Sequence, residues 1–464
     1  MTRLGPWLAL ACVACVRYQA RPLDPRSHPV EVSTRHLGDS TLVAAVARHA
    51  GAPDGSRWTD RQLAVAALRL RSDLRRLRAE WRASRAAVRT AGERPRPGVH
   101  GELERRVGGR EEGSPWVVAV GGLFALELGG KRGARLQAAR AGVAMAESRL
   151  LAASWNALTD ARRAAVQLLQ ASGEVGDARE EVQLLEEVHA LERVRYAEAA
   201  LGTSDLARTA TEIQNARLSL AEREHAVLRA RAALARALAV PVRAVQDIEP
   251  RLAPGAGCAS LDSVGADSVV AGAVGQRHEV SLALGRYALA ESRLRLEVAR
   301  QYPDLDLGPG FIWDQGVHRW TLALALPGLL GGRNRGAIGE ADAAREVAGL
   351  AVAEVQDSIM ADVESAIQRC RGAGLELAAA DSVVAAAARL VERVRAAYQR
   401  GETSRLEPAR AELQLLRAER ARRRAARGLA LASLELEGAS GGPTPAGAAW
   451  PDPRQEPEEE ASRP

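Results

Sequence analysis

The residues best suited to covalent chemistry near the start of this chain are two cysteines. Cys12 and Cys15 close a short apolar stretch behind Arg3, where a bacterial lipoprotein signal would place its acylated cysteine. Cys15 follows the small residue Ala14 and is a candidate for lipid attachment. The alternative is that both cysteines lie in a discarded signal. Either way, residues 1–15 predict export.

Other groups that could carry chemistry are isolated in the sequence. Cys258 and Cys370 match no metal or redox spacing, so we expect two unpaired thiols. Histidines such as His189, His225 and His278 occur singly, and the chain has no metalloprotease helix motif, phosphate loop or nucleophile elbow. The sequence therefore predicts a protein that is not an enzyme, with no cofactor and no metal.

The composition of the chain indicates a largely helical protein. Aromatic residues make up only 3% of the 464 residues, which favours long helices packed along their lengths over a thick aromatic core. The 64 basic and 58 acidic residues are interspersed, without the aromatic-lined basic stripe of a nucleic-acid surface. No apolar run after the N-terminus reaches the length of a transmembrane helix. Membrane contact would have to come through strands or lipid.

Two hairpins are predicted by alternating apolar residues, at about 98–107 with 116–128 and at about 304–313 with 317–326. Each strand has roughly the 9–11 residues of a tilted transmembrane strand. The polar second face of the first hairpin fits a water-filled lumen and an ordinary half-exposed sheet equally well. Six apolar residues would face lipid if the strands form a barrel: Trp116, Val118, Phe124, Trp313, Trp320 and Leu324.

Long helices follow both hairpins. They are predicted over about 134–200 and 204–240, and over about 337–400 and 404–437, because these runs are rich in helix formers. A helix of 67 residues would be about 100 Å long, which only a bundle or tube can accommodate. Gly202 and Gly401 mark the two reversals, where we expect the adjoining Ser or Thr to cap the next helix.

The remaining segments connect these units. We expect an extended leader at 16–40, then a short and a long amphipathic helix up to about residue 89, separated by a break at 51–56. Residues 241–263 form an irregular connector rich in Pro and Gly, and the tail at 438–464 should be disordered.

An internal repeat relates residues 41–240 to residues 264–437. Thr203-Ser204-Asp205-Leu206 corresponds to Thr403-Ser404-Arg405-Leu406, 200 residues later, and similar anchors fall at the other junctions. The fold class is therefore mainly α with a small β part, and the chain contains two copies of one unit of helices and a hairpin. Four strands per chain cannot close a barrel, which needs at least eight. Three chains would supply twelve.

The order of elements resembles the TolC-type outer-membrane efflux proteins over roughly residues 40–437. The residues that carry this resemblance are the Gly-Lys-Arg-Gly junction, the Pro-x-Leu-Leu-Gly-Gly-x-Asn-Arg-Gly junction, the Tyr-Pro-Asp-Leu segment at 302–305 and the Gly-containing turns at 202 and 401.

The resemblance implies a homotrimeric channel in the outer membrane of a diderm bacterium. Its twelve-stranded transmembrane β-barrel would continue into an α-barrel, a coiled-coil tube across the periplasm. Such a channel is the passive exit duct of a three-part efflux pump for small molecules or metal ions, with a periplasmic adaptor and an inner-membrane transporter as partners. The alternatives are a structural coiled-coil protein of the envelope and a type I protein-secretion duct.

The same resemblance places the adaptor contact at the two tight turns, which contain Gly202, Thr203, Ser204, Leu206, Gly401, Thr403, Ser404 and Leu406. Asp205 and Glu407 occupy the positions of acidic rings that constrict the pore. The chain departs from this pattern at Arg410, which can pair with Glu407 at i and i+3 and weaken that ring. The alternative is that Asp205 and Glu407 have no role in a pore and only stabilise the helix N-termini, by interacting with the positive end of the helix dipole.

Overall fold

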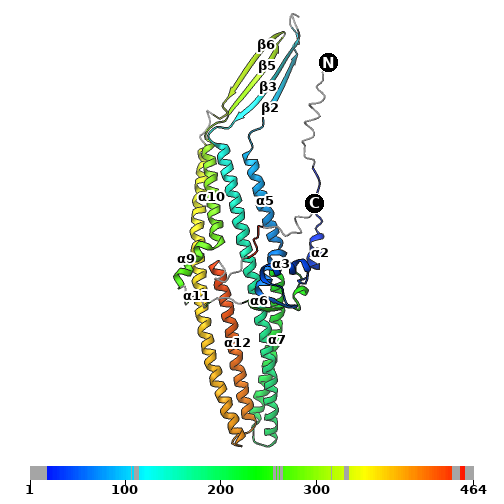
Figure 1. Ribbon diagram of the computed structural model, residues 1–464, viewed down its shortest axis with the longest axis vertical. Helices are drawn as coiled ribbons and strands as arrows, with labels where there is room; N and C mark the ends of the chain where they lie inside the picture. Colours follow the sequence, from blue (N-terminus) through cyan, green and yellow to red (C-terminus); the bar gives the residue numbers. More distant parts are fainter. Residues whose placement is uncertain are drawn as a thin grey trace.

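The computed structural model is an elongated molecule with a small sheet at one end and a helical bundle along the rest (Figure 1). It describes residues 18–105, 107–108, 114–253, 258, 261, 265–314, 316–328, 334–441 and 450–454. The two longest helices, α6 (Lys131–Ala197) and α11 (Arg335–Gln399), run from the sheet to the opposite end. The 67 residues of α6 correspond to about 100 Å.

One succession of elements occurs twice. In each copy a helix leads to a hairpin, a long helix and a shorter returning helix. The first series is α5 (Ser72–Gly92), β2 (Gly98–Arg105), β3 (Trp116–Leu126), α6 and α7 (Thr203–Leu238). The second is α10 (His278–Ala299), β5 (Leu305–Asp314), β6 (Val317–Ala325), α11 and α12 (Leu406–Ser440). The mainly helical fold class with four long strands is confirmed.

The smaller elements lie around the middle of the bundle (Figure 1). They are α2 (Ser27–Thr34), α3 (Ser40–Ala50), β1 (Arg57–Thr59), α4 (Asp60–Leu70), η1 (Val242–Val245), β4 (Glu249–Arg251) and α9 (Ala266–Gln276). Strands β1 and β4 form a parallel pair that the sequence did not predict, since three residues carry no readable period. The largest apolar core lies here and joins α3, α4, α6 and α7.

Two expectations for the N-terminal region were wrong. The leader is not wholly extended, because it contains α2. The long amphipathic helix is split into α4 and α5 at Arg71, whose backbone is extended. Tertiary contacts compensate for this break: the carbonyl of Leu70 accepts from Arg35, and the carbonyl of Leu68 accepts from Arg78. Such long-range partners leave no local signal in the sequence.

The expectation of unpaired thiols at Cys258 and Cys370 was also wrong. The two residues form a disulfide across 112 positions, with their Cα atoms 5.5 Å apart. They meet because α9 packs against α11 and α12 in one apolar cluster that includes both cysteines. A spacing pattern cannot reveal a pairing that only this packing creates.

The tail is not entirely without structure. Helix α12 continues to Ser440, and Trp450 packs against two apolar clusters of the bundle. Residues 1–15, including Cys15, lie outside the described residues. No helix in the described part of the chain combines the length and the hydropathy needed to cross a membrane.

Candidate functional site

The four long strands form one antiparallel sheet in the order β2-β3-β5-β6. Directly opposed residues point to the same side of an antiparallel sheet. Val118 opposes Trp313, and Leu307 opposes both Phe124 and Leu324. By this register and the alternation along each strand, one face of the sheet carries all six residues expected to face lipid: Trp116, Val118, Phe124, Trp313, Trp320 and Leu324.

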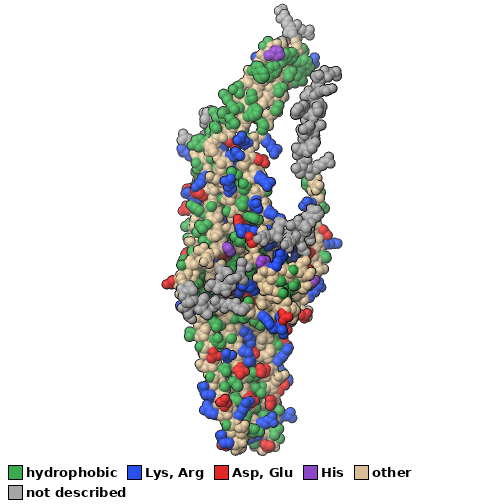
Figure 2. Space-filling model, in the orientation of Figure 1, with side chains coloured by type: hydrophobic (Ala, Val, Ile, Leu, Met, Phe, Trp, Pro, Cys, Tyr) green, Lys and Arg blue, Asp and Glu red, His purple; other side chains and the backbone are tan. Residues whose placement is uncertain are grey.

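This apolar face is open to solvent in the single chain. Trp320 is 84% exposed, and Leu322 and Leu324 are each 65% exposed. Figure 2 shows hydrophobic side chains gathered over the sheet end, while charged side chains are spread along the helices. An apolar surface of this extent on a soluble monomer would be unusual.

The opposite face of the sheet carries most of the charged side chains of the strands, among small residues and a few apolar ones that include Val117, Leu123 and Ile312. Glu102, Glu104, Asp314 and Arg319 border a hollow on this side, and Arg319 forms an ion pair with Asp314. In the described residues, β2 and β6 are each paired on one side only. The sheet thus has one largely apolar face, a second face that carries most of the charged residues of the strands (called the polar face below), and two open edges.

Asp304 fixes the junction between sheet and helices. Its carboxylate accepts hydrogen bonds from the backbone N–H of Leu128 (3.3 Å) and from Nζ of Lys131 (2.8 Å). Gly129 between them has φ +69°, and a Cβ there would come within 2.9 Å of the carbonyl oxygen of Ala299. The matching junction at 329–333 lies outside the described residues.

Two helix reversals form the other end of the molecule, the tip (Figure 1). Helix α6 turns into α7 at Gly202, and α11 turns into α12 at Gly401. The two glycines differ in backbone conformation. Gly401 has a positive φ of +77°, whereas Gly202 is extended with φ −81°. The expected Ser or Thr caps were wrong: Gly202 and Arg405 hold the N-cap positions, and neither makes a side-chain cap bond.

The residues expected to contact an adaptor differ in exposure. Gly202, Thr203, Ser204 and Gly401 are exposed. Four others are less accessible: Leu206, Thr403 and Ser404 are partly buried, and Leu406 is buried. Leu406 packs with Ala409 against Val188 of α6. Leu406 therefore holds the two helix pairs together inside the chain.

The acids at the tip are neutralised by arginines. Asp205 pairs with Arg208, and Glu407 lies 3.4 Å from Arg410, so the expected i, i+3 pair forms. Arg410 also binds Glu192 of α6 at 2.7 Å, and the Glu192 side chain is only 2% exposed. This second, buried acid was not foreseen from the sequence.

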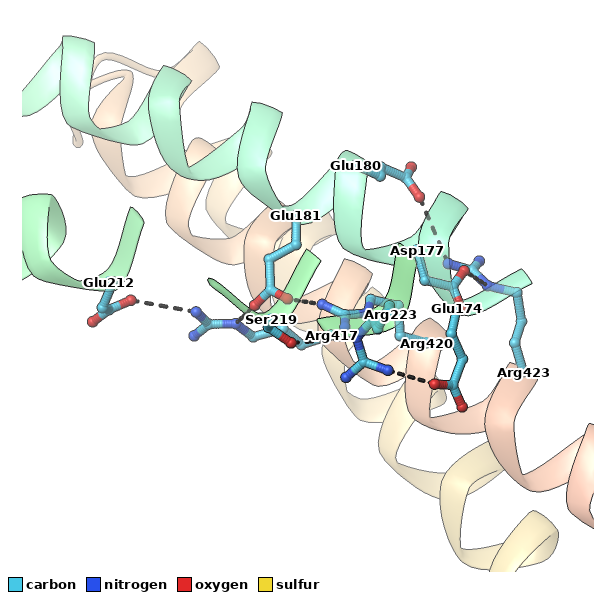
Figure 3. Close-up of polar contacts among 10 residues, drawn as sticks. All are labelled: Glu174, Asp177, Glu180, Glu181, Glu212, Ser219, Arg223, Arg417, Arg420 and Arg423. Atoms are coloured by element: carbon cyan, nitrogen blue, oxygen red, sulfur yellow. Dashed lines mark hydrogen bonds and ion pairs between the residues drawn. The ribbon is translucent and has the colours of Figure 1, made fainter. Parts of the chain in front are cut away.

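A longer ion-pair network joins α12 to α6 and α7 (Figure 3). Arg417 binds Glu181 (2.9 Å) and Glu212 (3.3 Å), while Arg423 binds Asp177 (2.8 Å). Arg420 also pairs with Glu181, and its burial lowers the pKa of its guanidinium. The sequence contains a pattern that could have indicated this network: basic residues on α12 and acidic residues on α6 both recur at three- and four-residue steps.

Comparisons with known proteins agree with this geometry. The model for the outer membrane efflux protein family matches residues 63–240. A membrane protein from Pseudomonas aeruginosa is 20% identical, covers 92% of this chain and 97% of its own, and has a TM-score of 0.67. The outer-membrane channel OprN is 17% identical, covers 87% and 92%, and has a TM-score of 0.67.

VceC, an outer membrane protein from Vibrio cholerae, is 20% identical over 82% of this chain and 95% of its own, with a TM-score of 0.64. No curated protein sequence matches the chain. The fold is that of outer-membrane channel proteins with a helical extension. The predicted resemblance to the TolC-type outer-membrane efflux proteins is confirmed.

Proposed function

We propose that this chain is one subunit of an outer-membrane efflux channel. Three copies join the open edges of β2 and β6 into a twelve-stranded barrel, and their helices form a tube into the periplasm. The observation that carries this proposal is the sheet with an exposed apolar face, a polar opposite face and two unpaired edges. A closed barrel is the arrangement that satisfies such edges in lipid.

The channel acts as a passive duct for small molecules or metal ions and performs no catalysis. Its tip receives a periplasmic adaptor, which connects it to an inner-membrane transporter. The exposed Gly202, Thr203, Ser204 and Gly401 form the contact surface, while Leu406 positions the turns from inside. Asp205 and Glu407 line the constriction, with their charge reduced by Arg208 and Arg410.

The exposed apolar face favours this duct over a soluble coiled-coil protein of the envelope. The test is to purify the full chain from outer membranes in detergent and to record conductance in planar bilayers. We expect an SDS-resistant trimer that dissociates on heating and opens stable pores. Recovery of a water-soluble monomer from periplasm without detergent would contradict the proposal.

A further inference from the structure

A buried ion-pair cluster joins three helices at the middle of the molecule. Arg162 of α6 donates from Nε to Asp60 of α4 at 2.7 Å, and its Nη1 lies 2.8 Å from Glu437 of α12. The other oxygen of Asp60 accepts from the backbone N–H of Ala253 at 2.7 Å. The side chains of Asp60, Arg162 and Glu437 are 3%, 12% and 13% exposed.

Trp450, from the C-terminal segment, lies over this cluster. The guanidinium carbons of Arg61 and Arg162 lie 4.8 Å and 6.0 Å from the centre of the indole ring. Trp450 also packs against the apolar clusters on both sides of the α4–α6 seam. Its ring therefore occupies a position from which it excludes water from Arg162.

Two further contacts fasten the residues after Trp450. The Nε atom of Arg78, a residue only 5% exposed, donates to the carbonyl of Pro453 at 2.7 Å. Arg454 lies 2.9 Å from Glu147 of α6 and is held by Asp452 at 2.9 Å. Residues 450–454 thus contact α4, α5 and α6, beside the place where α12 ends.

We propose that residues 450–454 form an intramolecular clasp that shields the Asp60–Arg162–Glu437 cluster and fastens the end of α12 and the α4–α5 unit to α6. Ion pairs are stronger where water is excluded, and salt screens them much less there. Without the clasp, the same charges become hydrated and their attraction becomes sensitive to salt. The clasp is independent of the proposed channel function, because it acts within one chain.

The test measures the thermal midpoint of the detergent-solubilised full chain at low and high salt. We expect Trp450→Ala to lower Tm by a few degrees and to make Tm fall further as salt rises. Truncation after Gly441 should do the same. Trp81→Ala is the matched control, since Trp81 also has an arginine over its ring, Arg85 at 5.1 Å, but belongs to neither of the apolar clusters against which Trp450 packs. It should lower Tm without adding salt sensitivity.

Each outcome decides the proposal. Wild-type Tm and salt response in the truncated chain would overturn the clasp. A salt response of Trp450→Ala equal to that of Trp81→Ala would overturn the shielding. If Trp450→Ala fails to fold, Trp450→Phe and Trp450→Leu take its place: the first keeps an aromatic face for Arg162 and should retain the wild-type salt response, whereas the second should lose it. Equal responses of these two variants would contradict the proposal.

Discussion

Arg410 on α12 and Glu192 on α6 form an ion pair of 2.7 Å next to the tip, with the Glu192 side chain 2% exposed. The pair joins the α6–α7 hairpin to the α11–α12 hairpin, beside the apolar contact of Leu406 with Val188. Removing one member of a buried pair leaves an uncompensated charge, whereas replacing both members by apolar residues is often tolerated.

We therefore expect Arg410→Ala to destabilise the tip by about 1–3 kcal/mol, because the buried carboxylate of Glu192 loses its partner while the half-exposed site of Arg410 admits water. Glu192→Met with Arg410→Met should recover most of that loss. Hydrogen exchange of the backbone amides in α6 and α12 near the turns measures the effect. Arg405→Ala, which changes an exposed arginine of the same turn, is the control and should leave exchange unchanged. Equal protection in Arg410→Ala and wild type would refute this assignment.

Arg208 should reduce the ion selectivity of the tip, because it pairs with Asp205. Arg208→Gln leaves Asp205 unneutralised, and in the proposed trimer three copies of this charge at the constriction should increase the preference for cations. The reversal potential of single channels in a KCl gradient reports this preference. Arg229→Gln removes an exposed arginine farther along α7 and serves as the control. A similar shift in both variants would indicate net charge rather than position.

Leu322 and Ala323 are neighbours on β6 that point to opposite faces of the sheet. Leu322→Lys places a charge on the apolar face, which costs about 2–4 kcal/mol near the middle of a bilayer. Ala323→Lys places the same charge on the polar face and should be tolerated. The yield of SDS-resistant trimer and the urea midpoint of unfolding from lipid vesicles compare the two. Equal losses would argue against a lipid-facing side.

Gly401 and Gly202 should respond differently to proline, because their backbone conformations differ. Gly401 has φ +77°, and its N–H donates to the carbonyl of Tyr398 at 2.9 Å. Proline allows neither feature. Gly202 has φ −81° and ψ 153°, which proline can adopt. We expect Gly401→Pro to abolish export while trimers still insert, and Gly202→Pro to retain export, with export measured as the cellular accumulation of a transported compound.

The Cys258–Cys370 disulfide should contribute to the stability of the bundle. It closes a loop of 112 positions, for which the chain-entropy model gives roughly 4–5 kcal/mol as an upper value. Reduction, or Cys370→Ser, should lower Tm, and Cys258→Ser with Cys370→Ser should match the single variant. Thiol titration of the unreduced, denatured chain checks the bond itself: reaction at both positions would show that it is absent.

The order of the long helices and of the four long strands, and the side of each strand that is apolar, follow from the sequence without a structure. Period-two alternation identifies which side of each strand is apolar, so Trp313 and Trp320 could be assigned to one face before the register was known. The lack of proline over long runs rich in Ala and Leu determined the long helices. Each of these patterns is local in the sequence, so it can be recognised without knowing which distant residues are in contact.

Tertiary structure alone decided which distant residues meet. The break at Arg71, the Glu192–Arg410 pair and the Cys258–Cys370 bond all depend on segments brought together by packing. Trp450 is the clearest case, because its segment is rich in Pro and Gly and lacks any period, yet it packs over Arg162. A site of this kind is created by three-dimensional proximity, and no spacing along the chain encodes it.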